Sequence, residues 1–192
     1  FRKFLEIDGW QIEYRTQPAQ KINLGSEKPV AGKKYYIYAN AKNNSSPLYL
    51  YNNDGSLATA TVVDAANEDA YIWEAAASGD YLTFESVATA GQYIGYGNSG
   101  SGLTVNTTPV QLDINSTYAS GQMSNCVGIM RIGNDNDGKY MVTKKDGSAF
   151  NRNSVATNGD WCSDYVFVEI PGDVVILTNV RKSGNHDLVI PE

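Results

Sequence analysis

Short stretches in which apolar and polar residues alternate recur along the whole chain. The first covers residues 4–14, where Trp10, Ile12 and Tyr14 follow one another at a period of two. This pattern predicts a strand, or a hairpin that turns at Asp8-Gly9. Proline and glycine then punctuate the chain up to about residue 30, which indicates a linker.

Between residues 32 and 170 the strand pattern is repetitive. Three segments open alike around Tyr36, Tyr81 and Tyr140, and a second aromatic stretch follows each opening. Each copy then leads to a closing apolar strand, at residues 71–75, 127–132 and 165–170. The copies differ in length, which loop insertions explain because long surface loops cost little extra closure entropy.

The closing strands carry a resemblance to a known family. Ile72-Trp73-Glu74 is the best match to the Q-x-W closing strand of the ricin-type β-trefoil family, while Met130 and Val168 replace the tryptophan in the other copies. No copy has the glutamine. The segment looks most like the divergent trefoil modules of surface glycan-handling proteins of gut Bacteroidetes. The resemblance implies an all-β fold, a β-trefoil of three unequal repeats with flanking N- and C-terminal strands.

Three parts are therefore expected along the chain. Residues 1–31 form an N-terminal strand and linker, residues 32–170 the trefoil, and residues 171–192 a C-terminal tail. In the tail, residues 173–180 and 188–190 are predicted strands. Because trefoil termini lie close together, the tail and the Trp10 strand could pair beside the barrel.

Composition limits the classes of binding partner and the cellular location that can be expected. The formal charge is −6, from 15 Lys and Arg against 21 Asp and Glu, so neither nucleic acid nor membrane lipid is expected as a partner. No apolar run is long enough for a membrane span, and the chain does not begin as a signal peptide or with Met, which suggests a processed chain or a fragment. Composition and resemblance favour a secreted or cell-surface protein. Cys126 and Cys162 are either bridged or two isolated buried thiols.

Two motifs suggest metal chemistry but lack the rest of a site. Residues 184–187 match the Gly-Asn-His-Asp signature of metallophosphoesterases, yet His186 is the single histidine and no Asp-x-His precedes it. Residues 135–138 begin like a calcium loop, yet no Glu lies at the required spacing. Polar turns are the expected structures for both, and no metal or cofactor is expected.

The sequence also lacks the motifs of an enzyme. There is no nucleophile elbow and no glycine-rich phosphate loop after a strand. Carboxylates on different strands could serve glycoside hydrolysis, but they are equally explained as polar-face residues: Glu74, Glu85, Asp113 and Glu169. The chain is therefore expected not to be an enzyme.

Aromatic and amide side chains remain as candidates for recognition. The chain has 13 Tyr, 3 Trp and several Asn-rich segments, and sugars are bound by a flat aromatic ring with amides or carboxylates for the hydroxyls. The candidate ligand-binding residues are Tyr51, Asn52, Asn53, Asp54, Tyr96, Asn98, Asn151, Asn153, Asp160 and Trp161. The repeat-position tyrosines are expected in the core instead: Tyr36, Tyr49, Tyr81, Tyr93 and Tyr140.

These features favour a non-catalytic carbohydrate-binding (lectin-like) accessory module whose partner is a glycan or polysaccharide, within a larger secreted or surface protein. The sugar site of the ricin-type family, an Asp in an early loop with an aromatic residue on the third strand, does not map cleanly onto this chain. Two alternatives therefore stay open. The chain could be a structural spacer or protein-interaction domain without sugar affinity, or a non-catalytic fragment of a glycan-active hydrolase.

Overall fold

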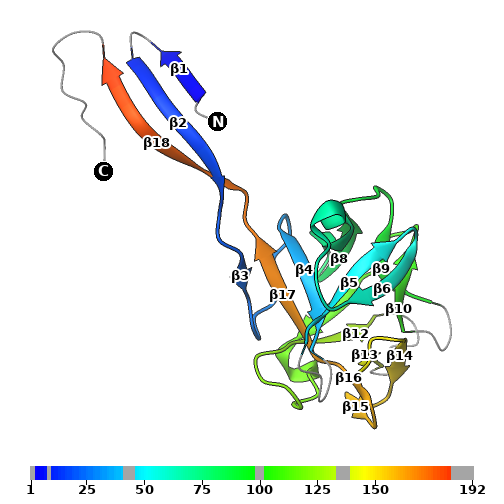
Figure 1. Ribbon diagram of the computed structural model, residues 1–192. Coiled ribbons are helices and arrows are strands. Elements are labelled where there is room, and N and C mark those ends of the chain that lie inside the picture. The colour runs from blue at the N-terminus through cyan, green and yellow to red at the C-terminus, as the bar shows by residue number, and fades with distance from the viewer. Residues whose placement is uncertain (1–2, 8–9, 41–45, 98–101, 133–138, 183–192) are drawn as a thin grey trace. The chain divides into compact units, whose positions relative to one another are not determined.

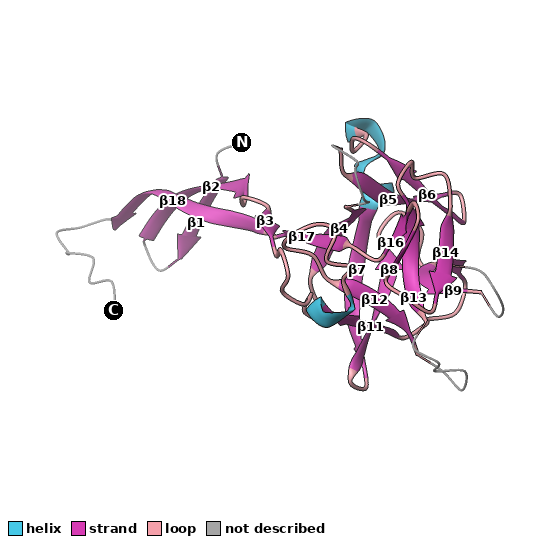
Figure 2. Cartoon of the chain, turned by 90° about the horizontal axis from the view of Figure 1, so that it is seen from below, coloured by secondary structure: helices cyan, strands magenta, loops and turns pink. Residues whose placement is uncertain are grey.

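The chain divides into two compact units. A computed structural model describes residues 3–7, 10–40, 46–97, 102–132 and 139–182. One unit contains residues 1–20 and 171–192, and the other contains residues 21–170. Strands make up nearly all of the regular structure, with two short 3-10 helices in the larger unit, η1 (Ala65–Tyr71) and η2 (Ser116–Tyr118) (Figure 2).

The smaller unit is a three-stranded antiparallel sheet built from both ends of the chain. Its order is β1 (Lys3–Ile7), β2 (Trp10–Pro18), β18 (Asp173–Lys182). Ile7 lies opposite Trp10, as in a hairpin. Trp10 in turn pairs with Lys182, and a register shift between Leu177 and Asn179 interrupts the second ladder.

The larger unit is a sheet that closes on itself (Figure 1). Its ring runs through β4 (Lys34–Ala39), β7 (Ile72–Ser78), β8 (Tyr81–Ser86), β11 (Leu112–Asn115), β12 (Gly128–Arg131) and β17 (Tyr165–Ile170). β17 pairs with β4 along its full length, and an isolated bridge joins Val127 to Tyr165. The two N–H···O bonds of this bridge measure 2.9 and 2.8 Å. They complete the ring, which leaves the barrel without an open edge at this point.

Further hairpins extend from the ring. Two of them are β5 (Leu48–Asn53) with β6 (Ser56–Ala60), and β9 (Tyr93–Tyr96) with β10 (Leu103–Asn106). β13 (Tyr140–Lys144) pairs with β12, with β14 (Phe150–Asn153) and with β16 (Trp161–Cys162), which carries β15 (Thr157–Asn158). β3 (Ile22–Asn23) pairs with β17, so residues expected in a linker are part of the larger sheet.

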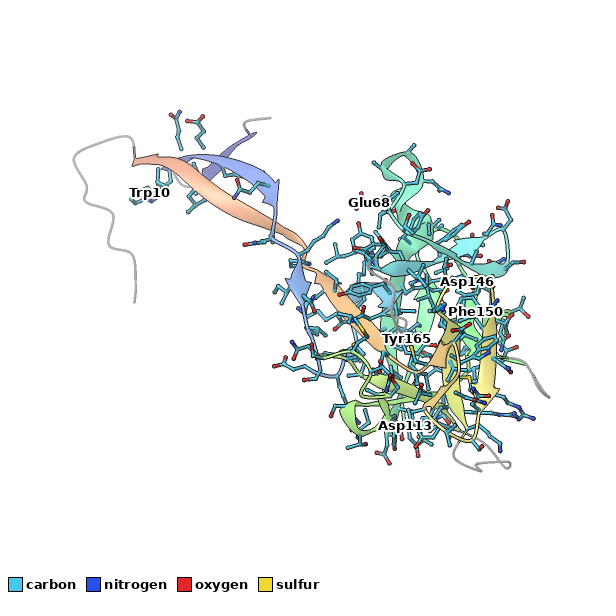
Figure 3. The ribbon with its side chains drawn as sticks, turned by 60° about the horizontal axis from the view of Figure 1, so that its bottom comes forward. Trp10, Glu68, Asp113, Asp146, Phe150 and Tyr165 are labelled. Atoms are coloured by element: carbon cyan, nitrogen blue, oxygen red, sulfur yellow. The ribbon has the colours of Figure 1, made fainter. Side chains whose placement is uncertain are left out.

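Large side chains from every part of the ring fill one core. Trp73, Tyr35, Tyr165 and Phe84 are completely buried, and Tyr165 lies in the middle of the unit (Figure 3). The buried indole nitrogen of Trp73 has a partner, since Nε1 donates to Leu50 O at 3.1 Å. Aromatic rings of this size supply much of the apolar area that a domain of short strands needs to bury.

The expected core tyrosines lie elsewhere. Tyr36 is buried, but in a second cluster outside the barrel core, and the other four are only partly buried: Tyr49, Tyr81, Tyr93 and Tyr140. Tyr35 takes the core position instead. Since side chains alternate between the faces of a strand, the expectation was wrong by one residue in register.

The closing strands show the same shift. Trp73 is buried, but Met130 and Val168 are partly exposed, while their neighbours Ile129 and Phe167 lie in the core. Cys126 and Cys162 are both buried and are not bridged.

Between β11 and β12 a long connection is held down by one buried carboxylate. Asp164 is completely buried and accepts three hydrogen bonds, from Ser120 N at 2.7 Å, Ser120 Oγ at 2.6 Å and Met123 N at 3.2 Å. Bonding of this kind offsets the cost of burying a carboxylate. It fixes the connection against the start of β17.

Candidate functional site

A hollow lies beside the β9–β10 hairpin. It has a volume of about 430 Å³ and is lined by Tyr96, Gly97, Val105, Asn106, Thr107 and Thr108. We call it the β9–β10 groove. The lining combines one aromatic ring, one valine, an amide and two threonine hydroxyls, and none of the described lining residues is charged. An apolar wall with a few placed polar groups is typical of sites that bind small polar ligands.

The sequence around Gly95 explains how the amide is positioned. A Cβ at Gly95 would lie 2.4 Å from Asn106 Nδ2 and 2.9 Å from Val110 Cγ2. The absence of a side chain therefore lets the Asn106 amide lie across β9, where Nδ2 donates to Tyr96 O at 3.3 Å. Because an amide has two N–H donors and a carbonyl oxygen, this bond leaves the second N–H and Oδ1 for a ligand.

Tyr96 is held in place at its hydroxyl end. Ile132 N donates to Tyr96 Oη at 3.1 Å, and the hydroxyl also contacts Ile132 O. The ring packs against the barrel core on the inside and lines the groove on the outside. A ring anchored in this way offers a flat, fixed surface at little entropic cost on binding.

A cation lies over the aromatic ring of the groove. The guanidinium carbon of Arg131 is 4.9 Å from the centroid of the Tyr96 ring, a cation–π distance. Arg131 is the last residue of β12 and lies opposite Leu112 on β11. The described lining of the groove is thus neutral, with a positive charge next to its aromatic ring.

The first set of sequence-predicted residues does not form one surface. Tyr51 stacks on Tyr71 with ring centroids 4.8 Å apart, whereas Asn52 is buried on the opposite face of β5. The Asn52 amide donates to Gln92 Oε1 at 2.6 Å, and its Oδ1 accepts from Gly55 N at 2.8 Å. Asn52 therefore stabilises the hairpin turn, and its buried amide is not open to a ligand.

The rest of this set forms the turn itself. Asn53 pairs with Ser56, and the two residues between them, Asp54 and Gly55, have φ values of 48° and 87°. Positive φ at both central residues is the geometry that Asp-Gly sequences favour in two-residue hairpin turns. What was expected to be an Asn-rich binding loop is a strand end followed by a tight turn.

The second set lies on the sheet of β13, β14, β15 and β16. Asn151 pairs with Val142, Asn153 with Tyr140, and Trp161 with Lys144, which places these three predicted residues at alternate positions and thus on one face. Asp160 is exposed and pairs with Lys145 at 3.0 Å. Asn151, Asn153 and Trp161 therefore form a second candidate surface.

Tyr96 is the sequence-predicted residue that lines the groove, and its predicted neighbour Asn98 lies outside the described residues. Sequence reasoning missed the other main contributors: Val105, Asn106, Thr107, Thr108 and Arg131. The polar run Asn106-Thr107-Thr108, directly after a strand, was the available signal. The two metal-like motifs, residues 135–138 and 184–187, also lie outside the described residues.

A smaller hollow of about 240 Å³ contains a pair of carboxylates. Glu74 and Glu85 lie opposite each other on β7 and β8, and Lys34 approaches Glu74 at 3.8 Å. Glu85 Oε1 accepts from Gly91 N at 2.7 Å, which is a turn contact. Among the described residues no group of three or more metal-ligating side chains is found.

The other two carboxylates considered for hydrolysis are each engaged within the fold. Asp113 Oδ2 accepts from Tyr118 Oη at 2.8 Å, and this bond raises the pKa of Tyr118. Glu169 pairs with Lys33 at 3.0 Å and raises the pKa of that lysine. Both carboxylates thus have structural partners.

Comparison with known proteins gives a match in structure. No family model and no curated protein matches the sequence. A solved structure, the ricin B-like lectin of Macrolepiota procera in complex with lactose, aligns with a TM-score of 0.54 at 13% identity, covering 76% of this chain and 100% of the lectin. None of the described helices is long and apolar enough to span a membrane. The match shows the fold: the chain is all-β and has a β-trefoil fold.

Proposed function

We propose that this chain is a non-catalytic carbohydrate-binding module and that the β9–β10 groove is its sugar site. The observation that carries the proposal is the lining of the groove: a fixed Tyr96 ring beside the Asn106 amide and two threonine hydroxyls. An aromatic face takes the C–H side of a sugar ring, while amide and hydroxyl groups bond its hydroxyls. The lectin fold of the structural neighbour supports this reading.

The proposal includes the wider setting. The barrel is organised as three unequal repeats, in which the connection from β11 to β12 is an insertion in the second repeat. The chain acts as an accessory part of a larger secreted or surface protein.

The test is a glycan array followed by titration calorimetry on the best ligand. Thr107→Arg and Thr108→Arg place a bulky side chain in the groove at exposed positions, so they should abolish binding without changing the melting temperature. Thr61→Arg, at an exposed position outside the groove, is the matched control and should bind as the parent does.

Two results would contradict the proposal. If both groove variants still bind, the sugar site lies elsewhere. The face of Asn151, Asn153 and Trp161 would then be tested with Trp161→Ala. If no glycan binds on a broad array of neutral and acidic glycans, a structural or protein-interaction domain would be favoured instead.

A further inference from the structure

Arg131 has buried donors without acceptors. Its Nε and Nη1 are both buried and have no hydrogen-bond partner among the described residues. Guanidinium groups are always charged, and a buried N–H without an acceptor retains the full desolvation penalty. Unpaired buried groups of this kind are rare in native proteins and often mark the place of an ion or ligand.

The neighbouring strand does not supply the acceptor. Asp113 is the carboxylate next to Arg131 on β11, but it lies opposite Met130, and alternation places it on the other face of the sheet. Its Oδ2 already accepts from Tyr118. The acceptor that Arg131 requires is therefore not Asp113.

Arg131 and the β9–β10 groove share one wall. The guanidinium lies 4.9 Å from the centre of the Tyr96 ring, and the same ring lines the groove. Arg131 is partly exposed although Nε and Nη1 are buried, so an acceptor reaches these two donors only when the side chain shifts. A sugar ring seated against Tyr96 would bring a substituent at its edge within reach of the guanidinium.

We propose that the ligand of the groove is an acidic saccharide, whose carboxylate or sulfate accepts hydrogen bonds from Arg131. This inference rests on the proposed carbohydrate site and names its ligand class. The planar guanidinium presents paired donors that match both anions, and both are therefore candidates. Because the chain has a formal charge of −6, long-range attraction does not explain anion binding, and Arg131 must supply it locally.

The first experiment uses the unaltered protein. Titration calorimetry compares trigalacturonate with its methyl ester, and lactose 3-sulfate with lactose, at low and at physiological ionic strength. The acidic form should bind about tenfold to a hundredfold more tightly than its neutral partner, and added salt should reduce the difference. A preference for trigalacturonate over its methyl ester would indicate a carboxylate, and a preference for lactose 3-sulfate over lactose would indicate a sulfate.

A second experiment assigns the preference to Arg131. Arg131→Met keeps an unbranched stem but removes the guanidinium and its charge, so it should abolish the preference for the acid while leaving weak binding of the neutral form. Arg131→Lys keeps the charge without the planar fork and should retain part of the preference. Lys28→Met, at an exposed position, changes the net charge equally and should have no effect.

The outcomes separate this inference from the proposed function. Equal binding of acidic and neutral forms, lost in Thr107→Arg, would overturn the acidic ligand and leave the sugar site standing. A double variant, Asp135→Asn with Asp137→Asn, tests whether Arg131 binds a carboxylate of its own chain. If its loss of stability is not additive with that of Arg131→Met, and no acid preference is seen, Arg131 serves its own chain and the inference is wrong. If Arg131→Met does not fold, the comparison of ligands on the unaltered protein still decides.

Discussion

Tyr165→Phe tests the packing of the barrel, because the difference in stability between the parent and this variant should change at alkaline pH. Tyr165 is completely buried; its hydroxyl lies 2.9 Å from Thr143 Oγ1 and donates to Met141 O at 3.3 Å. Thr143 is itself completely buried, so removal of the hydroxyl leaves a polar group without its partner. At pH 7 the variant should be less stable by about 1–3 kcal/mol.

The same hydroxyl makes the protein sensitive to high pH. Burial raises the pKa of Tyr165 well above its ordinary value, while the unfolded chain ionises near pH 10. The contribution of this tyrosine is therefore complete below about pH 10 and is lost as pH rises further, because the unfolded state alone releases the proton. The loss is about 1.4 kcal/mol per pH unit, or about 2.7 kcal/mol by pH 12.

Urea unfolding at several pH values between 7 and 12 measures both effects. The stability advantage of the parent over Tyr165→Phe should stay constant up to about pH 9.5 and then shrink, and it should vanish or reverse near pH 12. Tyr93→Phe, at a partly exposed site, serves as the control for the loss of one tyrosine. A difference between parent and Tyr165→Phe that stays the same from pH 8 to pH 12 would refute the reasoning.

Three further changes test the fold, each by urea unfolding. Trp73→Ala should cost about 3–5 kcal/mol, because it empties the largest completely buried site, and a loss below about 1 kcal/mol would contradict this packing. Gly128→Ala should lower the free energy of unfolding by about 1–3 kcal/mol or more, because a Cβ would lie 2.1 Å from Tyr118 O. Gly172→Ala is the control: a Cβ there has no neighbour within 4 Å, so the stability should not change. Asp164→Ala should cost about 2–4 kcal/mol and speed proteolysis between β11 and β12, because three donors lose their acceptor; resistance equal to the parent's would argue against this anchor.

Repetition and alternation were sufficient to predict the class of the fold. Trp73 was placed on a closing apolar strand, and it is completely buried on β7. The side of the sheet on which each side chain lies was predicted wrongly, because Tyr35 and Tyr36 are adjacent and chemically alike. Which of them faces the core depends on the register with β7 and β17, which is a property of the whole sheet.

The candidate site was predictable only in part for a related reason. Tyr96 is recognisable as an aromatic residue next to polar ones, but Asn106 reaches it only because Gly95 has no side chain. Arg131 comes from a strand 35 positions further along the chain and meets Tyr96 through the closure of the ring. Asn52 was misassigned because a turn-stabilising asparagine and a ligand-binding one look the same in sequence.

The most direct test of the central claim is a titration of isotopically labelled protein with lactose and with trigalacturonate, followed by amide chemical shifts. The account predicts that the shifts gather at Tyr96, Gly97 and residues 105–108, with the Arg131 side-chain signals moving for the acidic sugar. Shifts that gather instead around Tyr51 and Tyr71, or around Asn151 and Trp161, would contradict the proposed site. An absence of any shift at millimolar concentrations of both sugars would contradict it as well.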